Sequence, residues 1–170
     1  IAAGTVRPGD EIVVLPAGLR STVERIDTAD GPLEEAGAGT SVTLLLADDL
    51  DISRGDVLAA ADRPPQLTDV LSAALCWLSA KPLAPAARVL VKHGTRTTPA
   101  VVTAITARFD EQSLLTVDAP ATLELNDIGH ASLRLAEPLA VDPYAVSPRT
   151  GSFLVIDPQD GDTLAAGVIT

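Results

Sequence analysis

The chain has 170 residues, of which 46% are apolar but only 2% aromatic, and its formal net charge is −11. This length allows one large domain or two small ones, with cores built mainly from Val, Leu, Ile and Ala. The acidic charge disfavours nucleic acid as a general partner, because its phosphates would be repelled. The single cysteine, Cys76, excludes an internal disulfide framework and suits a reducing cytoplasm.

No apolar run approaches the length of about 18 residues that a membrane-spanning helix needs. No basic and apolar signal peptide opens the chain, which begins at Ile1 without a methionine. We therefore expect a cytoplasmic protein without a membrane partner, and we expect this chain to be a fragment of a longer one.

The first half consists of short apolar runs separated by turn residues. Runs rich in β-branched residues predict strands at 11–15, 20–27 and 40–47, while the small residues of 29–39 predict a loop with a short extended piece at its centre. A Gly55-Asp56 turn then opens another short apolar strand. Such spacing, at roughly ten residues per strand, is typical of a small barrel or sandwich.

The stretch from Leu50 to Leu58 and the Pro64-Pro65 pair after it organise the chain. Two successive prolines remove two backbone donors and restrict the residues before them. We interpret the stretch as the closing strand of one barrel and a short Pro-rich linker to a second. This interpretation predicts an all-β protein with two small barrels, at residues 1–62 and 67–170.

The second half begins with an ambiguous run. Residues 67–78 fit a helical face through Leu71, Ala74, Leu75 and Leu78, but they also fit one side of a strand. The pattern beyond predicts strands at 88–92, 100–108, 114–117, 122–125 and 130–135, and a closing hairpin of 152–157 with 163–169. Between them it predicts a polar turn at 93–99, a hairpin turn at 110–112, a turn at 126–129 and a proline-fixed loop at 142–150.

One turn gathers several hydrogen-bond donors. No acidic residue lies between Asp69 and Asp110, and within this window five residues crowd the predicted turn: Lys92, His93, Thr95, Arg96 and Thr97. Such donors suit a carboxylate, a phosphate or an acidic protein surface, although local pairing with acids of neighbouring strands is an equal alternative. We take these residues as a candidate interface, which replacement of Lys92 and Arg96 by Ser should weaken while leaving the fold intact.

The sequence contains no recognisable catalytic, cofactor or metal site. His93 and His130 have no neighbour at metal-ligand spacing, and the acidic cluster at Asp48, Asp49 and Asp51 lacks the spacing of a calcium loop. Neither a Gly-x-Ser-x-Gly turn nor a Gly-x-x-x-x-Gly-Lys-Ser/Thr phosphate loop occurs. Cys76 lies beside Trp77 in an apolar run and is predicted to be a core residue.

Several strings of the chain have a familiar order. In the first half they are Thr5-Val6-Arg7-Pro8-Gly9-Asp10-Glu11, Ile26-Asp27-Thr28, Asp30-Gly31, Glu34-Glu35-Ala36 and Asp51-Ile52-Ser53-Arg54-Gly55-Asp56. In the second half they are Trp77, Pro82-Leu83, Leu90-Val91-Lys92-His93-Gly94-Thr95-Arg96-Thr97, Leu125-Asn126-Asp127-Ile128-Gly129, Asp142-Pro143-Tyr144 and the closing hairpin. Over essentially the whole chain they resemble the second and third domains of the large subunit of bacterial sulfate adenylyltransferase, a translation-type GTPase related to elongation factors Tu and 1-alpha.

The resemblance implies two β-barrels, like domains II and III of translation factors, and favours a strand at 67–78. It further implies a parent enzyme that converts ATP and sulfate to adenosine 5′-phosphosulfate and pyrophosphate. In that family GTP and Mg²⁺ bind a GTPase domain absent from this chain, and a small catalytic subunit performs adenylyl transfer. Some members are fused to an adenylylsulfate kinase domain. We therefore expect this chain alone to be inactive, with its own GTPase domain and the small subunit as partners.

Two alternatives to this role stay open at the level of sequence. The chain could be the tRNA-binding part of a translation factor, against which its acidic charge argues. It could also be a β-barrel adaptor without an enzymatic parent, which the sequence preceding Ile1 would decide.

Overall fold

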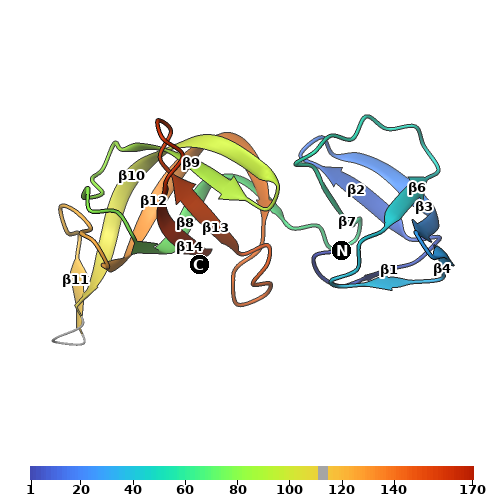
Figure 1. Cartoon of the computed structure of the whole chain (residues 1–170), viewed down its shortest axis with the longest axis horizontal. Helices are drawn as coiled ribbons and strands as arrows, with labels where there is room; N and C mark the ends of the chain where they lie inside the picture. Colours follow the sequence, from blue (N-terminus) through green and yellow to red (C-terminus); the bar gives the residue numbers. More distant parts are fainter. Residues whose placement is uncertain (111–114) are drawn as a thin grey trace. The chain divides into compact units, whose positions relative to one another are not determined.

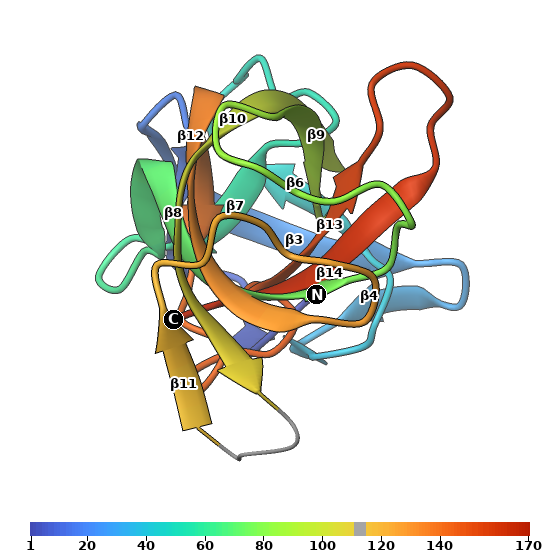
Figure 2. The same ribbon diagram turned by 90° about the vertical axis from the view of Figure 1, so that its left-hand side faces the viewer.

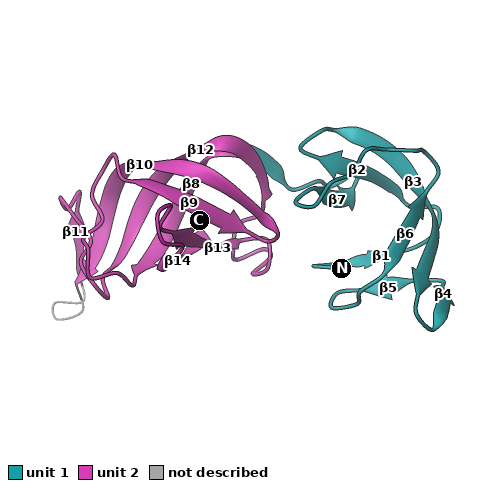
Figure 3. Ribbon diagram, turned by 45° about the horizontal axis from the view of Figure 1, so that its top comes forward, with its two compact units in different colours: residues 1–67 teal, residues 68–170 magenta. Residues whose placement is uncertain are grey.

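The chain folds into two compact units built from strands. The computed structural model describes residues 1–110 and 115–170. Unit 1 comprises Ile1–Leu67 and unit 2 comprises Thr68–Thr170 (Figure 3). The described residues form strands, turns and loops without a helix, so no helical segment among them could cross a membrane. The prediction of an all-β protein is confirmed.

Unit 1 is a curled sheet of the half-barrel kind (Figure 1). Its strands are β1 (Thr5–Val6), β2 (Glu11–Leu15), β3 (Leu19–Thr28), β4 (Gly31–Leu33), β5 (Ala36–Gly37), β6 (Thr43–Leu46) and β7 (Val57–Ala60). The sheet runs in the order β4-β3-β2-β7, with β6 also paired to β3, while β1 and β5 form a separate ribbon. Its core is aliphatic and consists of Ile12, Val14, Val23, Ile26 and Ala36.

Unit 2 is a closed barrel with one appended strand. Its strands are β8 (Gln66–Trp77), β9 (Arg88–His93), β10 (Arg96–Asp110), β11 (Leu115–Asp118), β12 (Ile128–Val141), β13 (Ser152–Ile156) and β14 (Thr163–Ile169). Six of them close the ring β10-β12-β8-β14-β13-β9 and back to β10, so each of the six has a hydrogen-bonded neighbour on both sides. Strand β11 pairs with the end of β10 outside this ring (Figure 2).

The barrel interior is filled by alternate residues of its strands. Those buried to 1% exposure or less include Leu71, Leu75, Val91, Val102, Leu133 and Val155, and the core also takes in Leu83 and Leu123 from segments outside the strands. Of the few aromatic residues, Trp77 and Phe153 lie in this core, and the Trp77 indole N–H donates to the carbonyl oxygen of Lys81 at 2.9 Å. Strand β8 covers residues 67–77 of the ambiguous run, as the resemblance implied, and buried positions alternate along it from Leu71 to Trp77.

The same four-residue turn precedes three strands, β2, β7 and β12. In each, the backbone N–H of the first residue donates to the carboxylate of an aspartate three positions later, and that aspartate's N–H donates back to the first carbonyl. The three pairs are Arg7 with Asp10, Ser53 with Asp56 and Glu124 with Asp127, at N–H to carboxylate distances of 2.8, 2.9 and 2.7 Å. The third residue has a positive φ each time, at Gly9, Gly55 and Asn126, which glycine and asparagine tolerate best.

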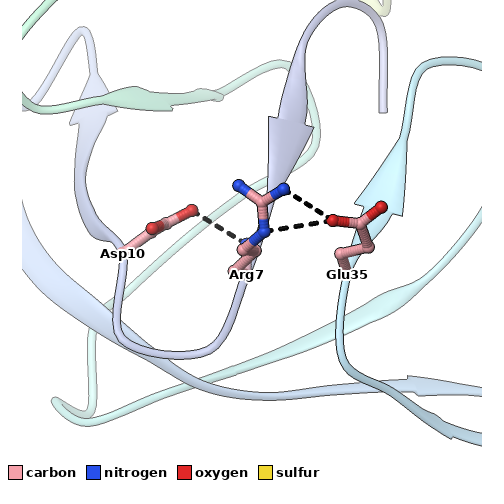
Figure 4. A network of polar contacts seen from close by, with 3 residues as sticks. All are labelled: Arg7, Asp10 and Glu35. Carbon is pink, nitrogen blue, oxygen red and sulfur yellow. Dashed lines mark hydrogen bonds and ion pairs between the residues drawn. The ribbon is translucent and has the colours of Figure 1, made fainter.

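The first of these turns carries an additional ion pair (Figure 4). The Arg7 guanidinium donates to the Glu35 carboxylate at 2.6 Å. Because Arg7 follows β1 and Glu35 precedes β5, this bond links the ends of the two paired strands. Both side chains are more than half exposed, so solvent screens the pair. The hydrogen bonds of the turn, and not this ion pair, define the local backbone.

The structure revises two sequence predictions and leaves a third untested. The polar turn at 93–99 shrinks to Gly94 and Thr95, because Thr98 and its strand neighbours alternate inward and outward and extend β10. Residues 122–125 form no strand, since Leu123 instead bridges to Leu83, which lies in a loop. The predicted hairpin turn at 110–112 lies largely outside the described residues.

Candidate functional site

The candidate interface at residues 92–97 is a strand hairpin whose residues point in different directions. In the register of β9 and β10, Lys92 lies opposite Thr97, and His93 lies opposite Arg96. Lys92, Thr95 and Thr97 are exposed. The alternation of a strand therefore divides residues that the predicted turn would have presented together.

His93 is turned inward, which corrects its expected place on an exposed turn. It is 7% exposed, and its Nε2 lies 2.7 Å from the carbonyl oxygen of Thr150. The hydroxyl of Thr150 in turn donates to Asp142 at 2.6 Å. His93 thus ties β9 to the loop at 142–150 and is a structural contact, not an accessible ligand.

Arg96 is already engaged within the barrel. Its guanidinium donates to the Glu137 carboxylate on β12 at 2.8 Å, and its side chain is 25% exposed. Half-buried, geometrically good pairs of this kind hold an arginine in one place. The cation of the hairpin that stays available to a partner is Lys92.

Lys92 belongs to a row of side chains across the outer wall of the barrel. Across β8, β14, β13, β9 and β10 this row consists of Cys76, Ala166, Leu154, Lys92 and Thr97. Their neighbours along each strand are buried or half-buried, so the row faces outward. A second row, formed by Ala74, Val168 and Ser152, runs beside it.

Except for Thr97, which is not part of the lining, the residues of these two rows form the floor of a groove of about 740 Å³, which we call the outer groove. The groove is hollow because four floor residues have short side chains: Ala74, Cys76, Ser152 and Ala166. Its walls are Ile128 and, from the loop at 142–150, Tyr144, Pro148 and Arg149. The loop that His93 anchors therefore supplies one wall.

The charged side chains that line the outer groove are cations. Lys92 and Arg149 are both exposed, and neither forms an ion pair with a residue in the described part of the chain. The described lining contains no aspartate or glutamate. In a chain of net charge −11, this is a local positive surface with an apolar floor.

Cys76 is not the core residue that the sequence predicted. It is half-buried and lines the outer groove, whereas its neighbour Trp77 is 2% exposed and points into the barrel. Successive residues of a strand face opposite sides, so an apolar run does not place both inside.

The described residues bring no three His, Cys, Asp or Glu side chains together as candidate metal ligands. Of the residues that sequence reasoning selected, Lys92 lines the outer groove. The sequence did not point to Tyr144 or Arg149 as site residues, because Tyr144 entered only through the family resemblance and the loop otherwise showed only its prolines. Only the barrel's register shows that this loop faces β8, β13 and β14.

The second unit matches a known domain family. Residues 70–170, which are more than half of the chain, match the family described as GTP-eEF1A C-terminal domain-like. In solved structures, sup35 complexed with GMPPNP superposes with a TM-score of 0.88 over 100% of this chain and 42% of that chain. At 21% identity, that likeness shows a shared fold.

Curated relatives extend the similarity to both units. The chain is 47% identical over 169 residues to sulfate adenylyltransferase subunit 1 of Methylorubrum extorquens, covering 99% of this chain and 36% of that protein. It is 40% identical over 170 residues to the bifunctional enzyme CysN/CysC of Mycobacterium tuberculosis, covering 99% of this chain and 28% of that protein. The chain thus spans about a third of the length of these relatives. By its matched domain and its strand order, this chain belongs to the GTP-eEF1A C-terminal domain-like family, in the branch whose curated relatives are named sulfate adenylyltransferase subunit 1.

Proposed function

We propose that this chain is the non-catalytic β-barrel portion of the GTPase subunit of a sulfate adenylyltransferase. Its parent would support the GTP-driven conversion of ATP and sulfate to adenosine 5′-phosphosulfate and pyrophosphate, in the cytoplasm. The observation that carries the proposal is 40–47% identity over 99% of the chain to relatives named for that enzyme and for CysN/CysC. Identity spread over both units favours a shared role over a shared fold alone.

The residues of this chain do not fit a nucleotide or magnesium site. The sequence holds no phosphate loop, and the described residues gather no candidate metal ligands. The proposal therefore assigns GTP and Mg²⁺ to a nucleotide-binding domain outside this chain, and we derive no catalytic step from residues 1–170.

The role that these units suit is to hold other parts of an assembly in place. Each unit has its own buried core, and the backbone of the barrel is closed. Rigid modules of this kind transmit a change of state through their surfaces, provided that an interface differs between the states. We assign Lys92, Thr95 and Thr97 to such an interface, with the nucleotide domain or the small catalytic subunit as the partner. A fused adenylylsulfate kinase domain would be a further neighbour in CysN/CysC-like parents.

A chimaeric enzyme tests the proposal. The matching region of the Methylorubrum extorquens subunit 1 is replaced by residues 1–170, and the chimaera is produced in a strain that lacks its own subunit 1. We expect growth on sulfate as the only sulfur source, and pyrophosphate release from ATP and sulfate that depends on GTP. The 170-residue chain by itself should restore neither.

Two controls decide what a failure means. A chimaera whose barrels are taken from a translation factor should not support growth, because it shares the fold without the family's surfaces. If the chimaera with residues 1–170 folds and binds GTP but forms no adenosine 5′-phosphosulfate, the proposed role is wrong. Activity of the isolated chain would contradict the non-catalytic assignment.

A further inference from the structure

The outer groove combines a hollow floor with an exposed apolar rim. Ala74 and Cys76 on β8 and Ala166 on β14 have short side chains, and the register places Cys76 opposite Ala166. Together they leave space above the outer face of these two strands. Around this space, Ile128 is 44% exposed and Leu154 is 38% exposed. A groove of about 740 Å³ with this lining can take up a large apolar side chain and remove its surface from water, which favours binding.

Charge selects among the groups that could fill this space. Lys92 stands at the β9 side and Arg149 on the loop wall, and neither is neutralised by a described carboxylate. Cations without local partners attract carboxylates of an incoming molecule and disfavour a basic one. The outer groove is therefore complementary to an apolar side chain that has acidic neighbours.

The fold also indicates how the occupant is recognised. Strands β8, β14, β13 and β9 are paired on both edges within the closed ring, so the floor offers no free backbone edge for strand addition. Recognition thus depends on side chains. A nucleic acid would bring a phosphate at every nucleotide onto a chain of net charge −11, whereas a short acidic segment needs only two carboxylates.

We propose that the outer groove binds an extended acidic segment of a partner protein, which inserts a large apolar side chain between Cys76 and Leu154 while its flanking carboxylates pair with Lys92 and Arg149. This inference deepens the proposed interface role of unit 2 and rests on it. It names the chemistry of the partner segment, which the family relationship does not.

A random dodecapeptide library displayed on phage supplies the probe, with the 170-residue chain immobilised as bait. We expect enrichment of peptides in which Asp or Glu flanks Leu, Ile, Phe or Trp. A synthetic copy of the most enriched peptide is then measured by fluorescence anisotropy. Cys76 is the chain's sole cysteine, so its alkylation by N-ethylmaleimide reports on the groove, and bound peptide should slow that reaction at least fivefold.

Three variants locate the binding. The double variant Lys92→Ser/Arg149→Ser and the groove-filling variant Ala166→Trp should each weaken peptide binding at least tenfold. The matched control is Arg88→Ser, which removes an exposed cation of the same strand, β9, outside the groove lining, and it should bind normally. Unchanged thermal unfolding shows that each variant is folded, which is expected because Lys92, Arg149 and Ala166 are exposed.

The other outcomes overturn the proposal. These are an absence of enriched peptides, enrichment without acidic residues, and acidic peptides that bind the double variant as tightly as the unaltered chain or leave the alkylation of Cys76 unslowed. The oligonucleotide dT12 is tested in parallel. If dT12 binds and the double variant loses that binding, the groove is a nucleic-acid site instead. Because the test uses the chain alone, its failure leaves the chimaera experiment, and thus the proposed function, unaffected.

Discussion

His93 Nε2 lies 2.7 Å from the backbone carbonyl oxygen of Thr150, a residue 57 positions further along the chain. Because a carbonyl oxygen only accepts, the Nε2 of His93 carries the proton in this hydrogen bond. The contact joins the end of β9 to the loop at 142–150, from which Tyr144 and Arg149 reach the outer groove. A histidine that the sequence placed in the candidate interface, on an exposed turn, is in fact part of the support of the groove wall.

Replacing His93 by Ala should lower the free energy of unfolding by about 1–3 kcal/mol, because the substitution removes a buried hydrogen bond and leaves the Thr150 carbonyl without this partner. Urea denaturation followed by tryptophan fluorescence measures the change, since Trp77 lies in the same barrel core. The matched control is His130→Ala, an exposed histidine of the same barrel, which should change stability by less than about 0.5 kcal/mol. An equal decrease in the free energy of unfolding in both variants would contradict the structural role assigned to His93.

Replacing Asp10 by Ala should destabilise unit 1 by about 1 kcal/mol, because the N–H of Arg7 loses its carboxylate acceptor in the turn before β2. Asp10→Asn keeps a side-chain oxygen and should lose less. The control is Asp30→Ala, an exposed acid in another turn of the same unit, which should have no measurable effect. Thermal unfolding by circular dichroism compares the three variants, and an Asp30→Ala loss as large as that of Asp10→Ala would contradict the assignment.

Replacing Gly167 by Ala should destabilise unit 2 by about 1–3 kcal/mol through overpacking. A Cβ at this position would lie 2.4 Å from Cζ of the Phe153 ring, so the ring would have to move within the core. Shortening the opposing residue in the double variant Gly167→Ala/Phe153→Leu should cost less than the sum of the two single substitutions. Gly37→Ala is the control, since nothing lies within 4 Å of its added methyl group. Additive losses in the double variant would show that the two residues do not clash.

Replacing Glu35 by Gln should change the free energy of unfolding by less than about 0.5 kcal/mol, although its carboxylate lies 2.6 Å from the Arg7 guanidinium (Figure 4). The reason is exposure: the Arg7 and Glu35 side chains are 61% and 57% exposed, so water replaces the lost interaction. Denaturation at low and high salt measures this variant. A loss above 1 kcal/mol at low salt would show that the pair fixes the fold of unit 1.

Local chemistry sufficed to predict much of the architecture. Gly9 and Gly55 mark turns that need a positive φ, and β-branched runs such as Glu11–Leu15 form strands where they were expected. The resemblance also selected a strand for Gln66–Trp77, whose periodicity alone was ambiguous. These features depend on a few adjacent residues, whose steric preferences act wherever the segment lies.

The outer groove, in contrast, was decided by tertiary structure. Its floor joins Cys76, Leu154 and Ala166, which are far apart in sequence and meet only because the barrel closes in one register. The same closure turned Cys76 outward, His93 inward and Arg96 toward Glu137. A period of two determines that neighbouring strand residues face opposite sides, but which side is the core depends on how the strands pair across the whole barrel.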